Sequence, residues 1–106
     1  MLYELRSYTI KPGRMADCHR VFQEACLPVF EAVGIRMIAF WEPDPADGTR
    51  FIYLLAFKDA AARTAAWPAF SAHPTWQAAK ARLAGDNPWE KTEATVLSPT
   101  SYSPLP

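Results

Sequence analysis

The most continuous apolar stretch of the chain is residues 50–57, Arg-Phe-Ile-Tyr-Leu-Leu-Ala-Phe. Seven apolar or aromatic residues follow Arg50, and Lys58 ends the run. The stretch is too short for an independent helix and rich in aromatic and branched side chains, so it predicts a β-strand. Because successive side chains of a strand point to opposite faces, both faces of this strand are apolar. Such a strand must be covered on both sides.

Strand-like composition recurs in three other places, residues 2–10, 35–41 and 91–98. The prolines, aspartates and glycine of residues 43–49 are turn formers, and we expect them to join the second strand to the apolar run as a hairpin. The alternation in residues 91–98 is weak, which is typical of an edge strand. The tail that follows is rich in proline and is expected to be extended.

A first helix is predicted between residues 14 and 33, where apolar residues recur with the spacing of one helical face. Pro28 lies inside this segment and lacks a backbone donor, so we expect a kink at that point. Gly34 is expected to end the helix.

A second helical region is expected to consist of two pieces. Asp59 is a candidate N-cap for an alanine-rich helix over residues 60–66. Trp67-Pro68 is expected to interrupt this helix, and a further piece begins at His73-Pro74 and ends near Leu83.

The resulting order is strand, helix, strand, strand, helix, strand. It predicts an α+β, ferredoxin-like βαββαβ subunit, in which a four-stranded antiparallel sheet carries its helices on one face and the first and third strands are central. The third strand is the apolar run, and the helices cover only one of its faces. A second copy packed against the other face is the simplest cover, so we expect a homodimer.

Composition limits the functional classes. The chain has 106 residues, enough for one domain over residues 1–106, and eleven basic residues balance eleven acidic ones. This balance argues against a nucleic-acid partner, and no apolar run reaches the ~18 residues of a membrane span. Cys18 and Cys26 lie on one predicted helix about 12 Å apart, beyond disulfide reach. Without a visible secretory signal, we expect a cytoplasmic protein.

The ordered set of short motifs along the chain resembles the NIPSNAP family. The resemblance extends over essentially the whole sequence and rests on the segments Tyr3–Tyr8, Lys11–Gly13, Leu27–Pro28, Gly34 before Phe40–Trp41, His73–Trp76 and Ser98–Leu105. It implies a dimeric α/β barrel built from ferredoxin-like subunits, and it implies no settled reaction. Similar dimeric barrels include small monooxygenases and haem-degrading enzymes, which is an analogy of fold alone.

The most unusual feature of the sequence is that Glu4, Arg6 and Tyr8 share one face of a central strand. Charged groups are costly to bury unless they are paired. One interpretation is a structural ion-pair network. The other is a polar patch in a pocket, where Arg6 binds an anionic or carbonyl group and Tyr8 donates a hydrogen bond.

Four further residues are candidates for the same pocket. Trp41 and Tyr53 are aromatic residues that either add walls to it or belong to the core. His19 lies at the edge of the apolar stripe of the first helix and is either a base or a partly buried helix residue. His73 precedes Pro74 and is expected to cap the next helix. The spacing of the histidines matches no metal motif, and with only four glycines there is no phosphate or dinucleotide loop, so we expect neither a metal nor a cofactor.

These observations leave three hypotheses for the function. The first is a homodimer that binds a small hydrophobic molecule in a pocket beside the sheet. The second is a cofactor-independent small monooxygenase or isomerase acting on an aromatic or polyketide-like substrate. The third is a protein–protein interaction module that uses its tail and helix faces. Whether the chain is an enzyme is left open by the sequence.

Overall fold

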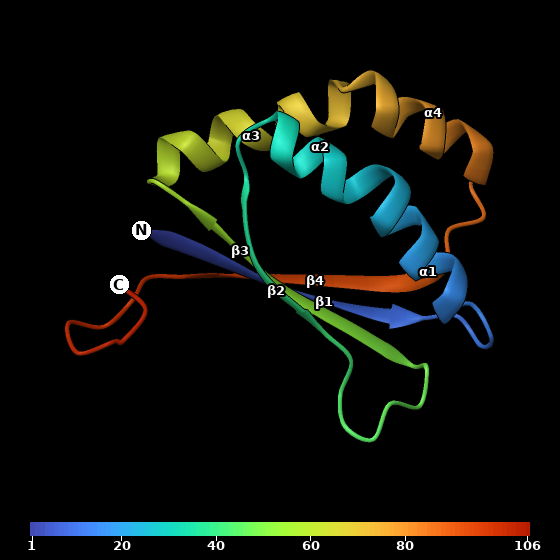
Figure 1. The fold of residues 1–106 in the computed structure, drawn as a ribbon, viewed down its shortest axis with the longest axis horizontal. Coiled ribbons are helices and arrows are strands. Elements are labelled where there is room, and N and C mark those ends of the chain that lie inside the picture. The colour runs from blue at the N-terminus through green and yellow to red at the C-terminus, as the bar shows by residue number, and fades with distance from the viewer.

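The computed structural model describes all residues, 1–106 (Figure 1). Four strands and a set of helical segments form two layers, and the molecule is only 18 Å thick along its shortest axis. In chain order the elements are β1 (Leu2–Ile10), α1 (Met15–Val21), a π-helical turn η1 (Phe22–Cys26), α2 (Leu27–Ala32), β2 (Arg36–Trp41), β3 (Arg50–Phe57), α3 (Ala60–Ala72), α4 (Pro74–Leu83) and β4 (Trp89–Leu97).

The sheet has the strand order β2-β3-β1-β4, and all neighbouring strands are antiparallel. The prediction of a ferredoxin-like subunit with the first and third strands in the centre is therefore confirmed. In the pairing of β1 with β3, Glu4 lies opposite Leu55 and Arg6 lies opposite Tyr53. This register places the polar residues of β1 on the same face as the aromatic residues of β3.

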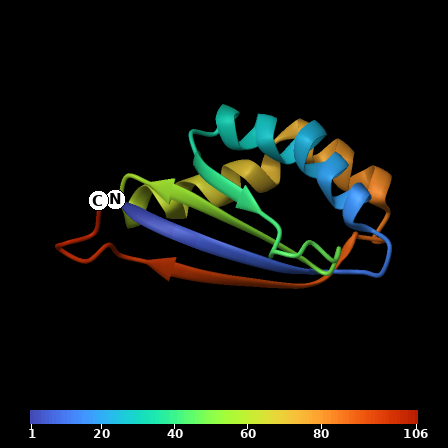
Figure 2. The ribbon, with the colours of Figure 1, turned by 60° about the horizontal axis from the view of Figure 1, so that its bottom comes forward.

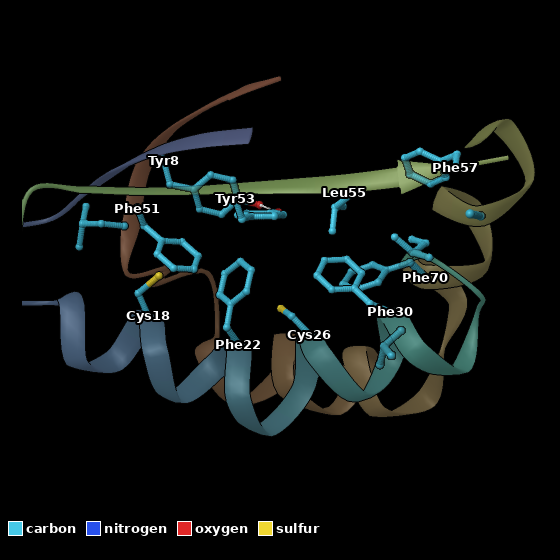
Figure 3. Packing of buried hydrophobic residues seen from close by; sticks show 14 residues of the cluster. Tyr8, Cys18, Phe22, Cys26, Phe30, Phe51, Tyr53, Leu55, Phe57 and Phe70 are labelled. Atoms are coloured by element: carbon cyan, nitrogen blue, oxygen red, sulfur yellow. Dashed lines mark hydrogen bonds between the residues drawn. The ribbon is translucent and has the colours of Figure 1, made fainter. Parts of the chain in front are cut away.

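All helices lie on one side of the sheet, as the two views in Figures 1 and 2 show. The core fills the space between the layers. Rings from β3 and from the first helical region interdigitate there, as in the edge-to-face contact between Phe22 and Phe51, whose centroids are 4.8 Å apart (Figure 3). Cys18 and Cys26 are buried free thiols in this layer. No helix is both long and apolar enough to cross a lipid bilayer.

The first helical region is continuous but changes its winding next to Pro28. The N–H group of Leu27 bonds to the carbonyl of Phe22, five residues earlier, which defines the π turn η1. A proline lacks a donor and its ring collides with the carbonyl four residues earlier, so widening the preceding turn is one way to keep the helix. The kink expected at Pro28 thus takes the form of a π turn over residues 22–26.

The second helical region corrects the sequence prediction. The helix was expected to stop before Trp67-Pro68, but α3 runs unbroken from Ala60 to Ala72. Pro68 is exposed, so its missing hydrogen bond falls on the solvent side. Trp67 and Phe70 face the core, where both rings pack against Phe30. Packing of these two rings thus outweighs the helix-breaking tendency of the proline.

The opposite face of the sheet has no helix over it (Figure 2). Leu5, Ile52 and Leu54 are half-buried on this open face, and Trp41 at the end of β2 is 48% exposed. The tail after β4 folds back over one end of the face, where the Tyr3 hydroxyl donates to the carbonyl of Pro106. The open face is thus apolar and only partly covered within one chain.

Candidate functional site

The centre of the candidate site is the carboxylate of Glu4, which β1 places under the helices. Its side chain has no exposed surface. Oε2 accepts a hydrogen bond from Nη1 of Arg6 at 2.7 Å, and Oε1 accepts from Nε of Arg63 at 2.6 Å and from the indole N–H of Trp67 at 3.0 Å. A buried carboxylate is tolerated when charged donors of this kind surround it.

Arg6 connects this carboxylate to a pair of tyrosines. Its Nε donates to the Tyr53 hydroxyl at 2.9 Å and its Nη2 donates to the Tyr8 hydroxyl at 3.3 Å. The two hydroxyls are themselves 2.9 Å apart and hydrogen-bonded. The guanidinium also lies 4.7 Å from the ring centroid of Trp67, a cation–π contact. Arg6 is therefore fixed in orientation from several sides.

The electrostatics of the network follow from this geometry. Burial alone would raise the pKa of Glu4, but the hydrogen bonds from Arg63, Arg6 and Trp67 outweigh it and the pKa is lowered. Burial would lower the pKa of Arg6, but the oxygens of Tyr53, Tyr8 and Glu4 raise it. Burial also raises the pKa of Tyr53. At neutral pH the network therefore consists of one carboxylate, two guanidinium groups and a protonated Tyr53.

A cavity of about 200 Å³ adjoins this network between the sheet and the helices. Nine of its eleven lining residues are hydrophobic. The lining comes from strands β1, β3 and β4 and from the helical segments η1, α2, α3 and α4. The lining residues are Arg6, Tyr8, Phe22, Cys26, Phe30, Tyr53, Trp67, Phe70, Ser71, Trp76 and Trp89. The cavity is thus an aromatic chamber with one charged group in its wall.

The π turn helps to shape this chamber. Phe22 and Cys26, the first and last residues of η1, both contribute to the wall. In Figure 3 these side chains point from the helix toward the sheet, with Tyr53 opposite them. Burial raises the pKa of the Cys26 thiol to about 12, so the thiol is protonated at neutral pH. Cys26 therefore lines the cavity as an apolar group and does not act as a nucleophile.

His19 and Trp41 do not reach this cavity. They line a second groove of about 250 Å³, together with Phe40, Glu42 and Phe51 among others. Nε2 of His19 lies 3.0 Å from Oε2 of Glu42, and both side chains remain partly exposed. Glu42 thus pairs with the histidine across the groove.

His73 lies apart from both hollows. It is the N-cap of α4, and its Nδ1 accepts a hydrogen bond from the backbone N–H of Thr75 at 3.2 Å. The structure therefore groups four of the seven sequence candidates, Glu4, Arg6, Tyr8 and Tyr53, at one site. It places the other three elsewhere. No set of three or more His, Cys, Asp or Glu side chains is arranged to hold a metal ion.

Sequence reasoning missed two members of the network, Arg63 and Trp67. Arg63 is 59 residues from Glu4 in sequence, and Trp67 was interpreted only as part of a helix break. Their spacing of four residues places them on the same side of a continuous helix, which was the available indication. Because Pro68 suggested that the helix ended there, the two residues were not expected to lie on one helical face.

Comparison with known proteins gives the family. The family model described as NIPSNAP matches residues 3–104, nearly the whole chain. The chain belongs to the NIPSNAP family. The resemblance noted from the sequence motifs is therefore confirmed. No curated protein sequence matches this NIPSNAP domain.

Solved structures agree with this assignment. An uncharacterized NIPSNAP domain protein from Burkholderia xenovorans is 27% identical, with a TM-score of 0.82 over 98% of this chain and 99% of that one. A NIPSNAP family protein from Agrobacterium tumefaciens is 23% identical, with a TM-score of 0.86 over 99% and 98%. A putative antibiotic biosynthesis monooxygenase from Nitrosomonas europaea shares the fold at 13% identity, with a TM-score of 0.67 over 93% and 98%. The last two likenesses concern the fold alone.

Proposed function

We propose that this NIPSNAP domain acts as a homodimer in which each chain binds a small, mainly apolar molecule in the cavity beside Arg6. The observation that carries the proposal is the aromatic chamber of about 200 Å³ with an oriented guanidinium in its wall. Apolar pockets with a few fixed polar groups are the usual form of small-molecule sites.

The chemistry of the wall favours binding over proton-transfer catalysis. A general base works best when its pKa lies near the operating pH. Arg6, Cys26 and Tyr53 all have raised pKa values and keep their protons at neutral pH. The carboxylate of Glu4 already accepts three hydrogen bonds and has no exposed surface. Both histidines lie outside the cavity, so the isomerase or monooxygenase alternative has no base at this site.

The dimer part of the proposal rests on the open face. Large apolar side chains such as Leu54 and Ile52 lie there with no helix over them, and the exposed Trp41 stands at the end of a neighbouring strand. Monomeric proteins rarely expose contiguous apolar patches of this kind. Two copies packed face to face cover both open faces at once, which leaves the two cavities on the outer, helical sides.

The cavity is tested directly with a small neutral ring. Fluorobenzene is titrated with the protein and followed by ¹⁹F NMR, and we expect saturable changes in its shift and line width. Cys26→Leu adds bulk inside the chamber and is expected to abolish binding, whereas Ser71→Ala in the same wall keeps it. Binding that is absent, or that survives Cys26→Leu in a folded protein, contradicts the proposal.

A further inference from the structure

The network has more hydrogen-bond donors than it has free acceptors. Tyr8 and Tyr53 carry two hydroxyl hydrogens between them, and the bond between the two oxygens uses one. Both oxygens already accept from Arg6. One hydroxyl hydrogen therefore has no acceptor within the chain. Both tyrosines line the cavity, so this unused donor belongs to the cavity wall.

The acceptors of the network, in contrast, are occupied. Each oxygen of Glu4 accepts at least one charged hydrogen bond, and the side chain has no exposed surface. The tryptophans of the wall have donors only, and a thiol is a weak partner in either direction. Ser71 can accept, but it lies at the exposed end of α3. The side of the cavity formed by Arg6 and the tyrosines thus has free hydrogen-bond donors and no free acceptor. It is suited to a ligand that carries an acceptor oxygen.

The charges of the network are unbalanced in the same direction. One carboxylate, Glu4, is paired with two guanidinium groups, Arg6 and Arg63. The side chain of Arg63 is 33% exposed, so water screens its charge in part. The side chain of Arg6 is 20% exposed and lines the cavity. An anion is therefore favoured over a neutral molecule beside Arg6, and a cation is disfavoured.

The cavity is partly open to solvent, and its volume sets how much of a ligand is buried. A dry apolar cavity of about 150 Å³ holds one benzene ring. The present cavity is about 200 Å³, which leaves room for one ring and a small substituent. Its walls are mainly rings, for example Trp89, whose centroid is 5.3 Å from that of Tyr8. Such walls suit a flat aromatic body.

We infer that the ligand is a single-ring aromatic molecule with an anionic acceptor oxygen, such as a carboxylate or phenolate, that is directed at Arg6 and the Tyr8–Tyr53 pair. This inference rests on the proposed small-molecule site and specifies its ligand class. The oxygen accepts the unused tyrosine hydrogen and a free N–H of Arg6, while the ring lies among the tryptophans.

Three probes with one ring and different polar ends test the inference by calorimetry. They are benzoate (anionic), toluene (neutral) and benzylammonium (cationic). We expect benzoate to bind at least about tenfold more tightly than toluene, since a hydrogen bond to a charged group contributes about 1.5–3 kcal/mol. Benzylammonium is expected to bind more weakly than toluene. The comparison uses the unaltered protein, so it does not depend on a variant that folds.

Two variants then locate the preference. The double variant Tyr8→Phe/Tyr53→Phe removes both hydroxyls, whereas a single variant would still leave one free hydroxyl hydrogen. We expect the double variant to reduce benzoate affinity about tenfold while toluene affinity stays within about twofold. Glu42→Gln in the separate groove is the matched control and leaves the ratio unchanged. Thermal unfolding of each variant shows whether it is folded.

The outcomes separate this inference from the proposal on which it rests. If toluene binds as tightly as benzoate, or benzylammonium binds best, the ligand class is wrong but the small-molecule site stands. A benzoate preference that is unchanged in the double tyrosine variant also overturns the inference. If none of the probes binds saturably, the inference and the proposed site both fail.

Discussion

The two faces of the sheet differ in what each leaves unpaired within one chain. The face under the helices contains Glu4 and Arg6, and the carboxylate of Glu4 is completely buried. The face without helices contains Leu5, Ile52 and Leu54, which are only half-buried. Alternation along β1 thus places two charges inside the chain, and alternation along β1 and β3 leaves leucines near its surface.

The difference indicates that the two faces suit different partners. On the covered face every charge has a partner within the chain, and the surplus is a set of donors directed at a cavity. On the open face the surplus is apolar area, which only a second surface can bury. This difference supports the proposal that the covered face binds a ligand and the open face binds a second copy of the chain.

The largest expected effect is on the covered face. Glu4→Ala leaves Arg6 buried without its counter-ion, and breaking a buried pair in this way costs about 3–5 kcal/mol. Urea unfolding of the variant measures this loss of free energy. Glu42→Ala is the matched control, because it removes a partly exposed pair that contributes about 0–1 kcal/mol. Equal losses in the two variants would show that the buried network contributes no more to the free energy of unfolding than a partly exposed ion pair.

The next effect is on the open face. Leu54→Glu places a carboxylate in the proposed interface of each copy, and we expect the dimer to dissociate at least about 100-fold more readily, which corresponds to about 2.7 kcal/mol. Light scattering over a range of protein concentrations gives the mass. Lys80→Glu also adds negative charge, but on the exposed surface of α4, and should leave the mass unchanged. A single-chain mass for the unaltered protein at micromolar concentration would contradict the dimer.

A smaller effect is expected from acid. The pKa of Glu4 is lowered in the folded chain from its ordinary value of 4.5, so folding is favoured by the ionised carboxylate. This contribution is complete above pH 4.5 and is lost as the pH falls through the lower, folded-state pKa. Unfolding free energies measured between pH 6 and pH 3 should fall less steeply for Glu4→Gln than for the unaltered protein. If the unfolding free energies of the two proteins fall in parallel, Glu4 does not contribute to the loss of stability in acid.

Local patterns predict most of the fold. The strand-like composition of residues 2–10 and the apolar run 50–57 give two strands with their observed limits, and the element order gives the sheet. The continuation of α3 through Pro68 could not be predicted in this way. It depends on Trp67 and Phe70 packing against Phe30, a contact between distant segments.

The site is predictable to a smaller extent for the same reason. Glu4, Arg6 and Tyr8 are visible as a group because one strand holds all three, and alternation alone places them on one face. Arg63 joins them from a helix 59 residues away, and His19 meets Glu42 from another element. Pairs of this kind depend on the tertiary structure, and nothing in the spacing of the sequence indicates them.

The four tryptophans provide the most direct test of the assignment of the covered face. Trp67, Trp76 and Trp89 line the cavity, whereas Trp41 lies in the separate groove. Indole N–H resonances are recorded by ¹H–¹⁵N NMR while toluene is added. We predict that the three cavity resonances shift and saturate together and that the Trp41 resonance stays in place. If the Trp41 resonance shifts and the other three do not, the ligand binds in the separate groove and not in the cavity beside Arg6.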